Sequence, residues 1–368
     1  MPFYDLLNKY PKKFISNYIR SADEKQIAGS LEKDNLEITD FLNLLSPKAR
    51  PFIEKMAQKS KKLTEQHFGK VIVLYIPFYI SNFCTNSCLY CGFRRQNRIL
   101  RKVLSLKEIE DNAKKITETG IKHLLVLTGE DRRKTPLEYL IKSVKILKKY
   151  FSFIGIEMFP METKEYSALK DAGVDGLTIY QETYDEKTYK KVHLSGKKAN
   201  FKYRLDTPDR SALAGFSSIN VGPLYGLAEP VSEAFYAGLH AYYLQKQYPD
   251  VDVSLSLPRI NEAEGACKKL FEVNDVTFVQ IILAYRLFLH RVGITLSTRE
   301  SAGMRDNLIS LGITRMSAGS QTGVGQYAEK KRQPKQFNIN DTRTVAEIAK
   351  TICKKGYEPV FKDWEMLR

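Results

Sequence analysis

Short apolar runs rich in β-branched and aromatic residues alternate with segments of helical period through most of the chain. Alternation of this kind is typical of a parallel sheet whose faces are covered by helices, because both faces of each strand are then buried. Eight runs fit the strand pattern, at residues 71–80, 123–128, 153–159, 176–181, 217–223, 251–257, 293–297 and 313–318.

Eight strand–helix repeats are the number that closes a (β/α)8 barrel of the TIM type. Several of the predicted helices end at a glycine, as at Gly120, Gly173 and Gly312, where a left-handed residue turns the chain toward the next strand. We therefore predict an α/β fold built on a (β/α)8 barrel. An open, doubly wound parallel sheet is the alternative.

The flanks of the repeat region have a different pattern. Residues 1–70 show helical periodicity interrupted at Ser46-Pro47, which predicts an N-terminal helical extension. The barrel is expected to span residues 71–320. Residues 321–368 predict a C-terminal extension of loop and a last helix at 342–354 that packs on the barrel.

In such a barrel the chemistry lies at the C-terminal ends of the strands. Polar and charged side chains collect at those positions, whereas the bodies of the strands are apolar. The strand ends fall at residues 79–91, Gly129-Glu130, Glu157, Gln181-Glu182, 222–225, Arg259, Arg299-Glu300 and 317–320.

Three of the five cysteines, Cys84, Cys88 and Cys91, lie within eight positions on the loop after the first predicted strand. Their CX3CX2C spacing lets each thiolate bind one iron of a [4Fe–4S] cluster and leaves the fourth iron without a protein ligand. That open iron can chelate S-adenosylmethionine (SAM), whose sulfonium C–S bond is then broken by one electron from the cluster. An aromatic residue directly before the third cysteine, here Tyr90, is usual in the enzymes that this pattern resembles and lies near the adenine there. Gly92 lets the backbone approach the cofactor.

Structural zinc is the competing interpretation, but it needs four ligands and neither a fourth cysteine nor a histidine lies nearby in sequence. The remaining cysteines, Cys267 and Cys353, are isolated, and we assign them no role. The set as a whole does not resemble a disulfide framework.

Composition and charge bear on where the protein is located and on the kinds of partner it binds. The chain has 368 residues, 43% of them hydrophobic, and contains neither a leader-like N-terminus nor an apolar run long enough to span a membrane, so we expect a cytoplasmic protein. Its formal net charge is +16. Scattered lysines favour solvated helix faces, with docking of an acidic electron donor or binding of nucleic acid as alternatives.

Several segments carry a resemblance to a known family. The stretch 78–93 resembles the radical SAM aromatic amino acid lyases, and above all the 2-iminoacetate synthases, the tyrosine lyases of thiazole (thiamine) biosynthesis. The resemblance runs from about residue 40 to the end. Its narrower motifs are LTGE at 127–130, YQETY at 180–184, GKK at 196–198, TPDR at 207–210, LSTRES at 296–301, and KDW at 362–364.

This resemblance implies roles for individual residues. Glu130 would hold the SAM amino group, and Glu157 and Glu182 occupy positions where related enzymes hold the ribose and the methionine carboxylate. Arg204, with Asp209 and Arg210, would support that pocket or form a structural ion network. Arg299 would bind the substrate carboxylate, as suits a bidentate cation, with Tyr79 and Ser317 as hydrogen-bonding neighbours.

The resemblance also implies a reaction and partners. The deoxyadenosyl radical would take hydrogen from the amino group of L-tyrosine, and the Cα–Cβ bond would break to give 2-iminoacetate and p-cresol. A low-potential flavodoxin or ferredoxin would supply the electron, and a thiazole synthase would consume the imine. No nucleic acid or membrane partner is expected.

Three alternatives remain. A tryptophan lyase shares most of these motifs. The hydrogenase-maturation tyrosine lyases fit less well, because they carry a second cysteine-rich cluster domain at the C-terminus, where this chain has Cys353 alone. A non-catalytic iron–sulfur protein that binds RNA would predict clustered arginines and aromatics.

Overall fold

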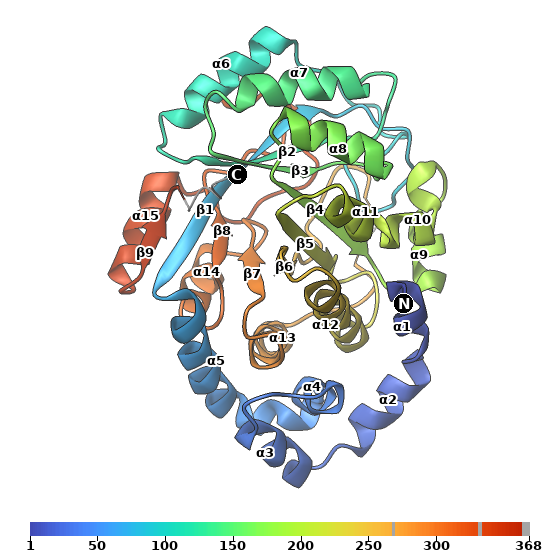
Figure 1. Ribbon diagram of the computed structural model, residues 1–368, viewed down its shortest axis with the longest axis vertical. Coiled ribbons are helices and arrows are strands. Elements are labelled where there is room, and N and C mark those ends of the chain that lie inside the picture. The colour runs from blue at the N-terminus through green and yellow to red at the C-terminus, as the bar shows by residue number, and fades with distance from the viewer. Residues whose placement is uncertain (267–268, 330–332, 363–368) are drawn as a thin grey trace.

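The computed structural model describes residues 1–368 except 267–268, 330–332 and 363–368. Cys267 and two residues of the KDW motif, Asp363 and Trp364, therefore lie outside the described residues. Within the described part of the chain a parallel sheet runs in the order β2-β3-β4-β5-β6-β7-β8-β1, and β1 also pairs with β2, so eight strands close into a barrel. The predicted (β/α)8 barrel is confirmed (Figure 1).

The barrel strands lie where the apolar runs predicted them. Their pairing is parallel throughout, with register shifts at the ends of β1 and β4, next to Ser81 and Glu182. The strands are β1 (Val71–Ser81), β2 (His123–Thr128), β3 (Phe153–Glu157), β4 (Gly176–Glu182), β5 (Ser218–Pro223), β6 (Asp252–Ser256), β7 (Gly293–Leu296) and β8 (Arg315–Ser317).

Amphipathic helices cover the outside of the barrel, and their apolar faces pack on the strands. Side-chain caps define several of their starts; Ser105 and Asn274, for example, accept hydrogen bonds from backbone amides of the first turn. The helices are α6 (Leu106–Thr117), α7 (Leu137–Leu147), α8 (Thr163–Ala172), α9 (Glu186–Val192), η2 (Lys197–Ala199), α10 (Phe201–Leu205), α11 (Thr207–Leu213), α12 (Pro230–Gln247), α13 (Asp275–Phe288) and α14 (Ala302–Leu308).

Helices before β1 form an arc along one side of the barrel, from α5 beside the start of β1 to α1 near α9 and α10 (Figure 1). The arc packs on α12 and α13, where Phe41 stacks on Phe288 with ring centroids 4.5 Å apart. Its helices are α1 (Phe3–Asn8), α2 (Lys12–Ser21), α3 (Glu24–Glu32), α4 (Ile38–Leu45), η1 (Pro47–Phe52) and α5 (Ile53–Phe68).

After β8 the chain crosses the C-terminal ends of the strands before it forms α15 (Val345–Lys354) and β9 (Glu358–Val360). Strand β9 was not predicted; it extends the sheet by pairing in parallel with the first residues of β1. Among the described helices, none is long and apolar enough to cross a membrane.

Candidate active site

The side chains predicted to act together line one cavity at the C-terminal ends of the barrel strands. Ser317 is the exception. Its hydroxyl lies at the end of β8, accepts a hydrogen bond from the Thr298 amide at 3.0 Å, and is absent from the lining of this cavity. The predicted residues that do line it are Tyr79, Cys84, Cys88, Tyr90, Cys91, Glu130, Glu157, Glu182, Arg204 and Arg299.

The loop that carries the three cysteines is held rigidly although it has little regular structure. Arg101 donates hydrogen bonds to four carbonyls on either side of the cysteines, those of Asn82, Phe93, Arg94 and Asn97. A guanidinium that binds four carbonyls fixes a loop without needing a helix or strand. Hydrogen bonds within the chain therefore help to set the shape of the loop.

The donor set fits an iron–sulfur cluster. Cys84, Cys88 and Cys91 are free cysteines, and burial raises the pKa of Cys88 to about 12 and that of Cys91 to about 11. Such thiols lose their protons at neutral pH only to a bound metal. In the described residues no three metal-ligating side chains converge on a single point. A cubane does not require this, because its three ligated irons occupy separate corners.

Glu130 is joined to the cysteine loop. Its Oε2 accepts a hydrogen bond of 2.6 Å from Asn86 Nδ2, and its carbonyl accepts from the amide and hydroxyl of Thr85. The neighbouring Gly129 allows the end of β2 to lie this close to the cysteine loop, because a Cβ at that position would be 2.4 Å from the Phe83 carbonyl oxygen. The second strand end and the cysteine loop therefore form one unit.

Tyr90 is oriented by a histidine that the sequence did not suggest. Its hydroxyl lies 2.7 Å from His193 Nε2, and His193 Nδ1 lies 2.9 Å from the Tyr189 carbonyl. A carbonyl only accepts, so Nδ1 carries the proton and Nε2 accepts from Tyr90. Burial lowers the pKa of His193 to about 3, which keeps the ring neutral.

Two carboxyl groups in the cavity differ in charge. Burial, followed by repulsion from Glu182, raises the pKa of Glu157 to about 7. Burial alone would raise the pKa of Glu182 as well, but Lys198 and Arg204 outweigh it and the pKa is lowered. Lys198 Nζ lies 2.5 Å from Glu182 Oε1, and an Arg204 nitrogen lies 3.6 Å from it. Glu182 is therefore ionised at neutral pH, whereas Glu157 titrates close to neutral pH.

Glu182 also has an unusual backbone. Its φ of 70° is the only positive value at a non-glycine residue in the described part of the chain. The two following residues are fixed by the buried Glu233 of α12, whose carboxylate accepts from Thr183 Oγ1 and from the Tyr184 amide, both at 2.9 Å. A left-handed glutamate persists only where its surroundings impose it.

Arg299 and Tyr79 are the polar groups on the opposite wall. In the described residues Arg299 forms no ion pair, and its guanidinium lies 3.3 Å from the ring centre of Phe337. Tyr79 donates a hydrogen bond of 2.6 Å to Gln336 Oε1, and Gln336 Nε2 lies 3.9 Å from Cys91 Sγ. Residues 336 and 337 therefore place the C-terminal segment over the cavity.

Sequence reasoning missed Lys198, Gln336 and Phe337, which line the cavity, and His193, which contacts the Tyr90 hydroxyl. Lys198 lies in the GKK motif, which gave a signal, but nothing in the local pattern of the other three points to a site. The structure gives Gly92 a purpose in addition to the predicted approach of the backbone to the cofactor. A Cβ there would lie 2.5 Å from the Lys335 carbonyl oxygen, so this glycine makes room for the C-terminal segment.

Two residues of the TPDR motif, Asp209 and Arg210, stabilise the fold. Asp209 accepts hydrogen bonds from the hydroxyls of Tyr243 and Tyr248, and Arg210 donates to the carbonyls of Met161 and Tyr203. Neither lines the cavity.

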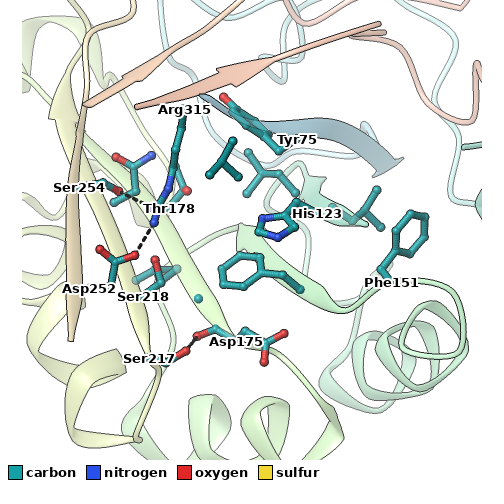
Figure 2. Close-up of a pocket in the computed structure, with 18 of the residues that line it drawn as sticks. Tyr75, His123, Phe151, Asp175, Thr178, Ser217, Ser218, Asp252, Ser254 and Arg315 are labelled. Carbon is teal, nitrogen blue, oxygen red and sulfur yellow. Dashed lines mark hydrogen bonds and ion pairs between the residues drawn. The ribbon is translucent and has the colours of Figure 1, made fainter. Parts of the chain in front are cut away.

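A second cavity, of about 890 Å³, lies at the opposite end of the barrel, where the strands begin. Figure 2 shows Arg315 reaching across it toward Asp252 and Ser254. The same strands line both cavities. On β4, for example, Thr178 lines this cavity and Tyr180, two residues later, lines the first one. No predicted catalytic or cofactor-binding residue lines this end.

Comparisons with known proteins agree with this geometry. The family model described as Radical SAM superfamily matches residues 78–233, and that of the Biotin and Thiamin Synthesis associated domain matches residues 256–358. The 2-iminoacetate synthase of Escherichia coli is 38% identical over 337 residues, which cover 91% of this chain and 89% of that protein. The chain belongs to the 2-iminoacetate synthase family.

As a member of this family of radical SAM enzymes, the chain is a carbon–carbon lyase that uses a [4Fe–4S] cluster and SAM. Solved structures agree. The [FeFe]-hydrogenase maturase HydG from Carboxydothermus hydrogenoformans is 33% identical, has a TM-score of 0.85, and matches 98% of this chain and 83% of that one. Methylornithine synthase, at 20% identity and a TM-score of 0.71 over 91% of this chain and 97% of that one, shares the fold.

Proposed function

We propose that this 2-iminoacetate synthase family member cleaves the Cα–Cβ bond of L-tyrosine to give 2-iminoacetate and p-cresol, with 5′-deoxyadenosine and methionine formed from SAM. The observation that carries the proposal is a cavity in which three thiols face an arginine without an ion-pair partner among the described residues. That arginine suits the carboxylate of a free amino acid.

Cys84, Cys88 and Cys91 would hold the cluster. When bound, the cluster and SAM supply the deoxyadenosyl radical by one-electron cleavage of the sulfonium C–S bond. Glu130 would accept a hydrogen bond from the SAM amino group, and Asn86 keeps its carboxylate in place. Glu157 and Glu182 would accept from ribose hydroxyls, while Arg204 and Lys198 provide cations for the methionine carboxylate. The Tyr90 ring would pack against the adenine.

Arg299 would bind the tyrosine carboxylate, assisted by Tyr79. Ser317, which does not line the cavity, would act indirectly by accepting a hydrogen bond from the Thr298 amide next to Arg299. Fixing the carboxylate places the substrate nitrogen, and proximity of the reacting atoms is what a radical hydrogen transfer needs. Phe337 and Gln336 lie against Arg299 and Tyr79, where they would help to keep water from the bound substrate.

The imine hydrolyses readily in water, so a protein that consumes it directly is expected. By resemblance this is the thiazole synthase of thiamine biosynthesis, and the matching Biotin and Thiamin Synthesis associated domain supports that pathway. The electron would come from a low-potential flavodoxin or ferredoxin.

The test is an anaerobic turnover of reconstituted enzyme with SAM, dithionite and L-tyrosine, in which 5′-deoxyadenosine, p-cresol and glyoxylate from hydrolysed imine are measured by chromatography. All three products are expected, and Cys88→Ala abolishes them. Arg299→Lys keeps the charge but loses the bidentate contact, so kcat/KM for tyrosine falls at least 100-fold while SAM binding is retained. Indole-derived products from L-tryptophan, without p-cresol from tyrosine, would instead identify a tryptophan lyase.

A further inference from the structure

The cysteine loop is covered on its outer side by one short segment. The amide of Leu89 donates to the Val192 carbonyl at 3.0 Å, the Ser87 amide donates to the Ser195 carbonyl at 3.1 Å, and Cys88 lies opposite His193 in this pairing. Leu194, which directly follows His193, is 60% exposed. Residues 192–195 are therefore the main layer of chain that separates Cys88 from solvent on this side.

The covering segment is strongly basic. Residues 187–205 contain seven lysines and arginines and no acid, and residues 92–107, which follow the third cysteine, contain six and no acid. Elsewhere the chain mixes its lysines with acids, as the i,i+4 ion pairs Lys114–Glu110 and Lys142–Glu138 illustrate. Two acid-free segments of this length beside the cysteine loop depart from that pattern.

The two basic segments lie side by side. Gln96 Nε2 donates to Ser87 Oγ at 2.6 Å, and Ser87 Oγ lies 2.7 Å from Ser195 Oγ. The Arg95 amide also donates to the Asn86 carbonyl at 2.8 Å. These contacts join Arg95 and Gln96 to Ser195 through residues 86 and 87 of the cysteine loop.

Four cations of this surface are free to meet a partner. Arg95, Arg98, Lys191 and Lys197 are exposed, and within the described ranges none of them forms an ion pair. The nearby Lys198 is different, because it pairs with Glu182 inside the cavity. We call the surface formed by Arg95, Arg98, Lys191, Leu194 and Lys197 the basic rim.

We propose that the basic rim is the docking surface for an acidic, low-potential electron-transfer protein, an inference that rests on the proposed radical SAM function. Electron transfer between proteins weakens steeply with distance, so the donor must dock over the part of the surface nearest the cysteines. Unpaired cations attract an acidic partner and steer its approach, and an exposed leucine among them supplies apolar contact.

The electron step is a simple exchange. A docked flavodoxin would give up one electron as its anionic hydroquinone becomes the neutral semiquinone, with no proton released, and the oxidised cluster that Cys84, Cys88 and Cys91 would hold would accept that electron. Arg101 donates to the carbonyls of Arg94 and Asn97, which orders the backbone on either side of Arg95 and lowers the cost of docking.

The test measures the Kd for oxidised flavodoxin by surface plasmon resonance. Flavodoxin flows over immobilised, reconstituted enzyme, and charge-reversal variants are compared with the parent. The rim variant carries Arg95→Glu, Lys191→Glu and Lys197→Glu. Its control carries Lys25→Glu, Lys61→Glu and Lys62→Glu, which are exposed on α3 and α5 of the N-terminal arc (Figure 1) and change the net charge equally. At about 50 mM salt the rim variant is expected to raise the Kd at least tenfold, and the difference shrinks as salt is added. The control stays within twofold.

Stopped-flow reduction of the cluster provides the second readout. Flavodoxin hydroquinone reduces the rim variant at least tenfold more slowly than the parent, whereas dithionite reduces both at the same rate. Parental binding and reduction in the rim variant, or an equal loss in the control, would overturn the docking surface. Failure to form p-cresol with dithionite would contradict the proposed function alone, since the binding comparison does not depend on it.

Discussion

At the scale of single residues, the least expected feature is the left-handed Glu182. Its conformation costs about 1–3 kcal/mol, and glutamate is not among the residues that adopt it readily, so no sequence pattern predicts it. The conformation lets one carboxylate face Lys198 and Arg204 at the end of a strand. Glu233 fixes the next two residues and so is a positioning residue rather than a ligand.

The change Glu233→Gln tests this. The amide keeps one acceptor but turns an NH2 group toward a second donor, either Thr183 Oγ1 or the Tyr184 amide. Glu182 should then relax, and SAM should bind about tenfold more weakly, which corresponds to ~1.4 kcal/mol. The change that SAM causes in the electron paramagnetic resonance spectrum of the reduced cluster measures this affinity.

Glu229→Gln is the matched control, because Glu229 accepts two amide hydrogen bonds at the start of the same helix and does not touch residues 182–184. Equal weakening of SAM binding by both variants would show that only the helix start matters. A third variant, Glu182→Gln, separates the ideas: if it leaves SAM affinity unchanged, Glu182 has no part in SAM binding.

At the scale of elements, periodicity predicted the eight barrel strands and the helix near residue 345, because each buries a face that recurs regularly. It did not predict β9, because a strand of three residues is too short to show a period. This strand forms because the first residues of β1 offer a free edge with which it can pair. Gln336 and Phe337 were missed for a similar reason: they lie in a loop, and only the folded chain brings them over β1 and β7.

The contact of this loop with Gly92 leads to a prediction at the same scale. Gly92→Ala places a Cβ 2.5 Å from the Lys335 carbonyl and 2.9 Å from that of Gln336, so the segment must move away. Tyrosine affinity is expected to fall about tenfold, because Tyr79 and Arg299 lose Gln336 and Phe337. Titration of tyrosine into enzyme of verified iron content measures the effect. Gly303→Ala, where nothing lies within 4 Å of the new Cβ, should leave affinity unchanged. Unaltered affinity in the Gly92 variant at full iron content would contradict a covering role.

At the scale of the whole molecule, the barrel interior departs from the usual filling by bulky branched side chains. Inward-facing positions carry Gly155, Thr178, Asn220, Ser254 and Thr295 near the strand starts, and Glu157 and Tyr180 near the strand ends. Small polar residues in the strands weaken the apolar signal, yet the strands were still predictable because their outward faces pack on helices. Stability must then come largely from the layer between strands and helices.

The N-terminal arc belongs to that layer, which gives a prediction about the fold. Phe41 is fully buried between Phe288 of α13 and Phe235 of α12, and Gly238 provides its space, since a Cβ there would lie 2.7 Å from the ring. Phe41→Ala should lower the free energy of unfolding by about 3–5 kcal/mol.

Because the arc packs on two barrel helices, this loss should shift the unfolding of the whole chain as one transition, measured in urea by far-ultraviolet circular dichroism and fluorescence. Phe14→Ala, on α2 of the same arc, removes a ring that is 38% exposed and should cost under about 1 kcal/mol. If Phe41→Ala instead leaves the main transition in place and only speeds proteolysis within residues 1–70, the extension is a separable unit and the barrel alone holds the site. A single shifted transition would mean that the arc and the barrel unfold as one unit, so that the arc contributes to the stability of the strand ends that carry the cysteines.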